Sequence, residues 1–167
     1  MEQLKKYSPA LFALIIFCYL LPFYNISYYG LKQASITGLQ IVIDKGYLVP
    51  PELLGHDKNS ASIYITYDVY FARLVLLMAF LGLLISFTIF RKKSNKSLFS
   101  SIVLITSAVF LFILKNNLDN DVRSDGKGLF FIEYEFGYWL ALLVIIISAV
   151  LQGMIYNQER KIDTVNS

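Results

Sequence analysis

Four long apolar stretches constrain the fold of this 167-residue chain more than any other feature. They cover residues 9–24, 70–90, 98–114 and 136–156, and Arg73 is the only charged side chain within them. At about 1.5 Å of rise per residue, stretches of this length suit a hydrocarbon layer about 30 Å thick, the first being the shortest. The sequence therefore predicts an all-α membrane protein, built as a four-transmembrane-helix bundle.

The rest of the chain leaves room for loops but not for a separate soluble domain. It comprises outer loops over residues 25–69 and 115–135, a short loop over 91–97 and the two ends, so we expect residues 1–167 to form a single membrane domain. The formal net charge of +3 is too small to indicate a nucleic-acid partner. The expected environment of the chain is a lipid bilayer.

The placement of charge predicts an orientation. Loop 91–97 carries four basic residues and no acidic ones, whereas loops 25–69 and 115–135 each hold more acidic than basic residues. Because short cytoplasmic loops are enriched in Lys and Arg, we expect loop 91–97 and both termini to be cytoplasmic. Abundant Ile, Asn and Lys favour a bacterial source and hence a bacterial cytoplasmic (inner) membrane, whereas Asn25-Ile26-Ser27 would be a glycosylation acceptor in a secretory pathway.

The first apolar stretch is expected to be a retained span. A cleaved signal peptide is the rival interpretation, but residues 21–24 lack the paired small residues that a signal peptidase requires. Cys18, the only cysteine, is expected to be a small apolar residue within this helix.

Strand-like segments interrupt both outer loops. Residues 26–29 and 35–43 predict a hairpin whose second strand ends at Asp44, and residues 62–67 and 129–136 alternate between apolar and polar side chains. Pairing all of these gives a small antiparallel extracytoplasmic β-sheet formed by the two outer loops.

Two polar segments could form a contact surface beyond this sheet, or could be solvated loops. One is the turn-rich tip at residues 49–59, which contains His56 and Asp57, and the other is Asn116–Lys127. His56 and Asp57 could bind a metal, but a lone histidine on a loop tip rarely does so. We predict neither a metal nor a cofactor.

Three charged residues are candidates for a site near the outer ends of the spans. Arg73 could extend its charge to the interface, could pair with Asp68, Glu133 or Glu135, or could bind an anionic headgroup. Glu133 and Glu135 alternate onto one strand face and could form an acid–base pair or a cation site.

Small residues spaced by four could allow helices to approach closely. They are Gly82 and Ser86 in the second stretch and Ala149 and Gly153 in the fourth. They could seal the bundle or mediate self-association.

Three short motifs carry a resemblance. The chain has Leu21-Pro22-Phe23 after its first span, Thr37-Gly38-Leu39 in the loop that follows, and Gly137-Tyr138-Trp139 opening its last span. In these motifs it resembles uncharacterised small bacterial four-helix membrane proteins. Its layout is similar to that of the claudin and tetraspan superfamily, although Gln40 stands where claudins have tryptophan and there is no cysteine pair. The resemblance implies a layout and no activity.

These observations predict a non-enzymatic integral membrane protein. We expect an accessory or interaction subunit that recognises another membrane or envelope component, or a second copy of itself, through its outer loops. One alternative is a channel or transporter component that acts as an oligomer. Another is a lipid-handling enzyme at the outer interface that uses Glu133, Glu135 and Arg73.

Overall fold

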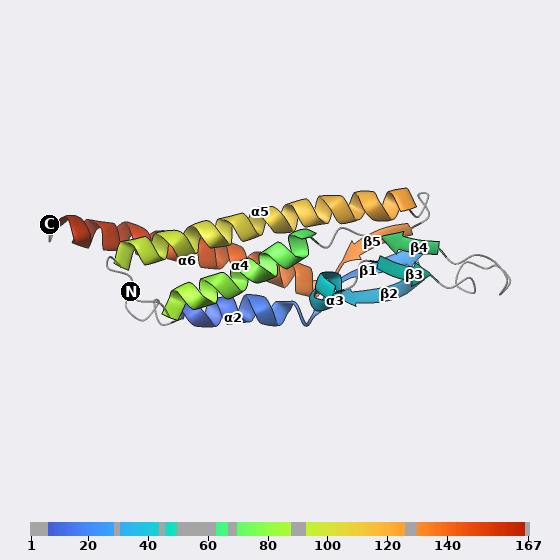
Figure 1. Cartoon of the computed structure of the whole chain (residues 1–167), viewed down its shortest axis with the longest axis horizontal. Coiled ribbons are helices and arrows are strands. Elements are labelled where there is room, and N and C mark those ends of the chain that lie inside the picture. The colour runs from blue at the N-terminus through green and yellow to red at the C-terminus, as the bar shows by residue number, and fades with distance from the viewer. Residues whose placement is uncertain are drawn as a thin grey trace.

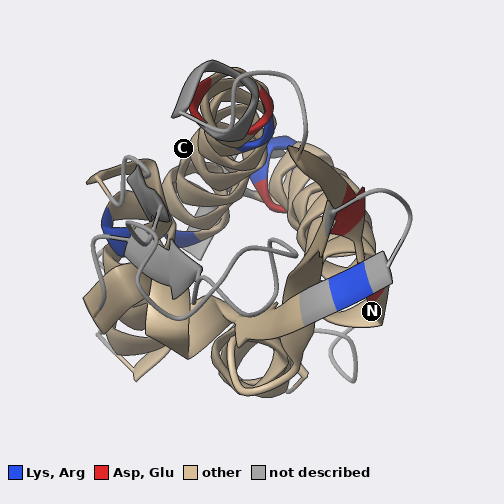
Figure 2. Ribbon diagram, turned by 90° about the vertical axis from the view of Figure 1, so that its right-hand side faces the viewer, with Lys and Arg blue, Asp and Glu red and all other residues tan. Residues whose placement is uncertain are grey.

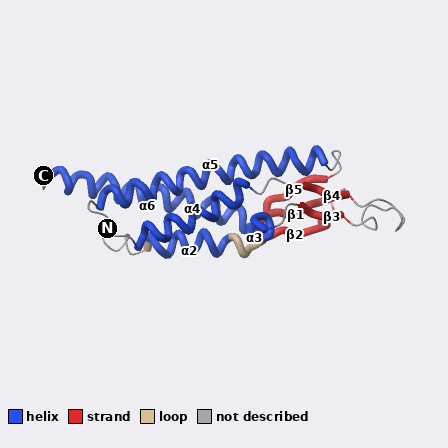
Figure 3. The backbone as a smooth tube through the Cα atoms, in the orientation of Figure 1, coloured by secondary structure: helices blue, strands red, loops and turns tan. Residues whose placement is uncertain are grey.

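The chain forms an elongated bundle of helices with its strands gathered at one end (Figures 1 and 3). The computed structural model describes residues 7–28, 31–43, 46–49, 63–66, 70–87, 93–125 and 130–165. In chain order its elements are α2 (Ser8–Cys18), β1 (Pro22–Tyr28), β2 (Leu31–Thr37), α3 (Gly38–Ile43), β3 (Gly46–Val49), β4 (Ile63–Thr66), α4 (Tyr70–Phe87), α5 (Lys93–Asp125), β5 (Phe130–Tyr134) and α6 (Phe136–Val165).

Within the described part of the chain, three helices are long and apolar enough to cross a membrane. They contain the segments Tyr70–Phe87, Asn95–Asp121 and Phe136–Ile162. Large apolar side chains cover their outer faces; Leu84, Phe112 and Val150, for example, are each more than half exposed. A soluble protein rarely exposes so much contiguous apolar surface, so these faces suit contact with lipid.

The first predicted span is shorter than expected. Helix α2 has 11 residues and is about 16 Å long, so a fourth transmembrane helix is not shown. The chain turns at Tyr19 and Leu20, and Pro22 then begins β1. Because proline has no backbone N–H, it cannot continue the helical hydrogen bonds, and residues 22–24 form strand rather than helix.

Helix α5 is much longer than its predicted span. It has 33 residues, or about 50 Å, and includes most of the polar segment predicted to be a loop at Asn116–Lys127. The prediction of a loop is therefore wrong for residues 116–125, which are helical. No proline or glycine occurs between Leu114 and Gly126 to stop the helix. An ion pair one turn apart, Lys115 Nζ to Asp119 Oδ2 at 2.8 Å, supports the extension.

The strands of the described residues form two sheets rather than the single sheet predicted. Antiparallel strands in the order β2-β1-β5 make the larger sheet, with Tyr24 opposite Tyr134 and Ile26 opposite Ile132. This confirms the predicted hairpin and the predicted strand before α6. Strand β4 instead pairs with β3, with Tyr47 opposite Ile65.

The predicted strand over residues 35–43 is wrong beyond Thr37, where α3 begins. Thr37 Oγ1 accepts a hydrogen bond from Gln40 N at 3.2 Å, and Thr37 N donates to Gln40 Oε1 at 2.9 Å. This reciprocal pair is a capping box, which satisfies backbone donors at the start of a helix. The Thr-x-x-Gln spacing was visible in the sequence and outweighs the β-branched residues that follow it.

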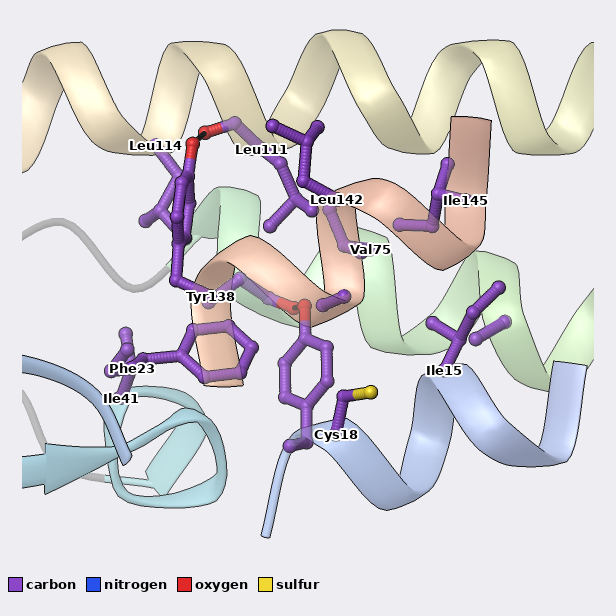
Figure 4. Close-up of a cluster of buried hydrophobic side chains, with 14 of the residues drawn as sticks. Ile15, Cys18, Phe23, Ile41, Val75, Leu111, Leu114, Tyr138, Leu142 and Ile145 are labelled. Atoms are coloured by element: carbon purple, nitrogen blue, oxygen red, sulfur yellow. Dashed lines mark hydrogen bonds between the residues drawn. The ribbon is translucent and has the colours of Figure 1, made fainter. Parts of the chain in front are cut away.

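One continuous core connects the bundle to the larger sheet. Figure 4 shows side chains of α2, α3, α4, α5, α6 and β1 meeting in it, including Ile15, Phe23, Val75, Leu111 and Tyr138. The strands and the C-terminal part of α5 therefore lie at the same end of the molecule, which we call the sheet end (Figure 1).

Candidate functional site

The three motifs that carried the sequence resemblance meet at the junction between the bundle and the larger sheet. Gly38 N donates to Leu21 O at 3.3 Å, and Leu39 N donates to Tyr19 O at 2.7 Å. The rings of Phe23 and Tyr138 lie 6.1 Å apart, nearly perpendicular. Residues separated by more than a hundred positions are thus in contact, and we call this region the junction.

Two glycines allow the chain segments to approach this closely. A Cβ atom on Gly137 would lie 2.5 Å from Pro22 O, and one on Gly38 would lie 2.9 Å from Tyr19 Cα. Each distance is shorter than a carbon atom can tolerate against backbone. Both positions therefore require glycine for steric reasons.

Aromatic rings fill the space around these glycines. Tyr138 lies 4.8 Å from the ring of Tyr134 and 5.2 Å from that of Trp139, and Tyr19 lies 4.9 Å from Phe23. The hydroxyls of Tyr19 and Tyr138 donate to the backbone carbonyls of Ala72 and Leu111 at 3.2 Å (Figure 4). The two tyrosine hydroxyls therefore tie the junction to α4 and α5.

A polar cluster fastens β5 to α5 beside the aromatic rings. The Tyr134 hydroxyl lies 2.9 Å from Asp119 Oδ1 and 3.0 Å from Lys115 O, and Lys115 Nζ lies 4.6 Å from the centre of the Tyr134 ring. Burial, reinforced by the negative charge of Asp119, raises the pKa of Tyr134 above its usual value. Sequence reasoning missed this cluster because it treated Lys115 and Asp119 as loop residues.

The two predicted carboxylates occupy different environments. Glu135 accepts a hydrogen bond from the buried Asn25 side chain and lies 3.5 Å from Lys32 Nζ. Glu133 is exposed on β5. Figure 2, viewed from the sheet end, shows both basic and acidic residues on the strands and on α5.

Among the described residues, Arg73 does not pair with Glu133 or Glu135, two of the partners considered for it. Its Nε donates to Val42 O at 2.8 Å, tying α4 to α3, and within the described part of the chain it forms no ion pair. Asp68 lies outside the described residues, as do His56 and Asp57.

The small residues divide into two groups. A Cβ atom on Gly82 would lie 2.0 Å from the Phe12 ring, and Ser86 Oγ lies 3.3 Å from Ser8 Oγ, so this pair seals α4 against α2. A Cβ atom on Gly153 would meet nothing within 4 Å.

Ala149 and Gly153 instead line an open surface groove of about 470 Å³ between α5 and α6. Its lining is otherwise mostly apolar: Ser101, Ile105, Ala108, Val109, Phe112, Ile146 and Val150. We call it the α5/α6 groove.

Polar side chains connect the helices at the end of the bundle away from the sheet. Buried Gln152 donates from Nε2 to Ser8 Oγ at 2.7 Å, which links α6 through Ser8 to Ser86 on α4. Nearby, Ser97 Oγ donates to Glu159 Oε2 at 2.6 Å. Sequence reasoning assigned the polar residues of the spans no specific partners.

Among the described residues, no group of three or more His, Cys, Asp or Glu could hold a metal ion. No protein-family model matches this chain, and no curated protein or solved structure matches it.

Proposed function

We propose that this protein is a non-enzymatic accessory subunit that binds another membrane protein. The α5/α6 groove is the observation that carries the proposal. It is an apolar groove on the surface of two span-length helices, and Gly153 lies in it with nothing within 4 Å of the position that a Cβ atom would take. Because helices associate in lipid mainly through close packing, such a groove suits a transmembrane helix of a partner.

The structure of the two ends supports an orientation for this subunit. Lys96 lies near the start of α5, away from the sheet, and Arg91 and Lys92 precede that helix in the sequence. The excess of positive charge therefore falls opposite the sheet end. We propose that the sheet end is extracytoplasmic, with α2 completing a four-helix arrangement and both termini in the cytoplasm.

Variants of Gly153 test the role of the groove. Gly153→Leu fills the groove without meeting another atom at Cβ, so the fold should persist while partner binding is lost. Leu84→Phe, at an exposed position on α4 outside the groove, is the matched control. The tagged proteins would be extracted in mild detergent, and co-purifying proteins and particle mass would be determined.

A stoichiometric partner that is retained by Leu84→Phe and lost by Gly153→Leu would support the proposal. A lone monomer in the unmodified protein, or a partner equally retained by Gly153→Leu, would overturn it. A particle containing only copies of this chain would place a second copy in the groove and would contradict the accessory role.

Cysteine labelling tests the orientation independently. In a Cys18→Ala background, Lys32→Cys on β2 should react with a membrane-impermeant maleimide in intact cells. Asn157→Cys on α6 should react only after the membrane is opened. The reverse pattern would show that the sheet end is cytoplasmic.

A further inference from the structure

A second apolar groove lies on the opposite side of the bundle from the junction's polar cluster, between α2, α4 and α3. Its volume is about 400 Å³, and its lining is almost entirely apolar. The residues that line it are Ala13, Ile16, Phe17, Tyr19, Leu20, Leu39, Leu76 and Phe80. We call it the α2/α4 groove.

Helical spacing places a positive charge at one end of this groove. Arg73 precedes Leu76 by three residues and Phe80 by seven, so the three lie on one face of α4, with Arg73 nearest the sheet. On α3, Val42 follows Leu39 by three residues in the same way. The hydrogen bond from Arg73 Nε to Val42 O therefore lies directly beside the groove residues Leu39 and Leu76.

The positions of Arg73 and of the groove residues along α4 match the headgroup and acyl-chain layers of a lipid leaflet. Arg73 is exposed and lies about one turn inside the start of α4, next to the exposed Tyr70, a residue type common at the headgroup layer. Phe80 lies about 10 Å deeper along the helix, within the hydrocarbon region. A charge at headgroup depth above an apolar groove at chain depth is complementary to an anionic phospholipid.

The guanidinium retains donors for such a ligand. Val42 O uses the Nε donor, and the terminal nitrogens form no hydrogen bond with any other described residue. The planar guanidinium can offer paired N–H groups to phosphate oxygens, and its bond to Val42 fixes its direction.

We propose that the α2/α4 groove and Arg73 form a binding site for one anionic phospholipid. One acyl chain lies in the groove, against Ala13, Leu76 and Phe80, and the headgroup phosphate accepts hydrogen bonds from Arg73. The site involves different elements from the α5/α6 groove, so it does not depend on the proposed function.

Native mass spectrometry of the full-length protein tests the site. The protein would be released from vesicles of equal parts phosphatidylglycerol and phosphatidylcholine, and the lipids that remain bound would be counted. We expect one retained phosphatidylglycerol. Arg73→Gln should lower its retention about tenfold, the effect of losing a hydrogen bond from a charged group. Arg73→Lys, which keeps the charge, should retain the preference for phosphatidylglycerol.

Two further variants separate the groove from the charge. Ala13→Phe, on a different helix, fills the groove and should reduce retention of both lipids. Lys32→Gln removes one positive charge at the same end of the molecule and should leave retention unchanged. Equal retention in the unmodified protein, Arg73→Gln and Ala13→Phe would overturn the proposal. Displacement of the lipid by inorganic phosphate alone would also overturn it, because the groove would then contribute nothing.

Discussion

At the scale of single residues, identical residue types have different roles because their surroundings differ. Gly137 lies against the backbone of Pro22, whereas Gly153 faces open space. Both were visible in the sequence as small residues at or near the ends of an apolar stretch. Only the positions of distant segments distinguish a glycine that the fold requires from one that leaves a groove.

The two glycines therefore predict opposite responses to an added methyl group. Gly137→Ala should lower the free energy of unfolding by about 1 to 3 kcal/mol, since Pro22 O is backbone and cannot move aside easily. Gly153→Ala should leave it unchanged or raise it by up to about 1 kcal/mol through better helix propensity. Thermal unfolding in detergent, followed by size-exclusion chromatography, measures both. Equal melting temperatures for the two variants would contradict the structure.

From the raised pKa of Tyr134 we predict a loss of stability at high pH. Tyr134 holds its proton more tightly in the folded state than in the unfolded state, where its pKa is about 10. The stabilisation that protonated Tyr134 provides is therefore complete below pH 10 and is lost as the pH rises above that value. Melting temperatures measured between pH 8 and pH 11 should fall less steeply for Tyr134→Phe than for the unmodified protein. Parallel curves would show that the Tyr134 hydroxyl is not buried beside Asp119.

At the scale of elements, local signals account for much of what the structure contains. The capping box explains α3, and the absence of glycine and proline explains the extension of α5. The contacts between elements were not predictable in this way. Ser8, Ser86 and Gln152 come from three helices, and no periodicity within any one helix indicates that they form a linked group.

This linked group predicts coupling between α2 and α6. Ser8→Ala removes the acceptor of Gln152 Nε2, and Gln152→Leu removes the donor. Hydrogen bonds between helices in membranes contribute about 0.6 kcal/mol on average and at most about 1.7 kcal/mol, so the coupling energy should lie in this range. A double-mutant cycle based on unfolding in mixed detergent micelles measures it. Fully additive effects of the two substitutions would show that the bond does not form.

At the scale of the whole molecule, α5 is longer than a bilayer is thick. Its length of about 50 Å exceeds the hydrocarbon thickness of about 30 Å, and its C-terminal part lies beside β5. The larger sheet therefore packs beside one end of a continuous helix that is longer than the hydrocarbon layer. We expect the polar C-terminal part of α5 to lie outside the hydrocarbon.

Labelling along α5 tests this arrangement. In a Cys18→Ala background, Asn116→Cys and Asn120→Cys should react with a water-soluble maleimide in opened membranes, whereas Phe112→Cys should not. All three positions are exposed in the structure, so only the surrounding solvent should separate them. Rapid reaction at Phe112→Cys would show that Phe112 does not lie within the hydrocarbon layer.

The sequence by itself determined that the chain is a membrane protein, the approximate positions of three spans, the β1–β2 hairpin and the strand before α6. Each of these follows from a local property, namely apolar length or period-two alternation. The tertiary structure decided which faces of the helices pack together, that Arg73 donates a hydrogen bond to Val42 O, and that β4 pairs with β3. It also decided which small residues have other segments packed against them. Lipid makes the outside of a span as apolar as its inside, so hydrophobic periodicity cannot identify the packed face.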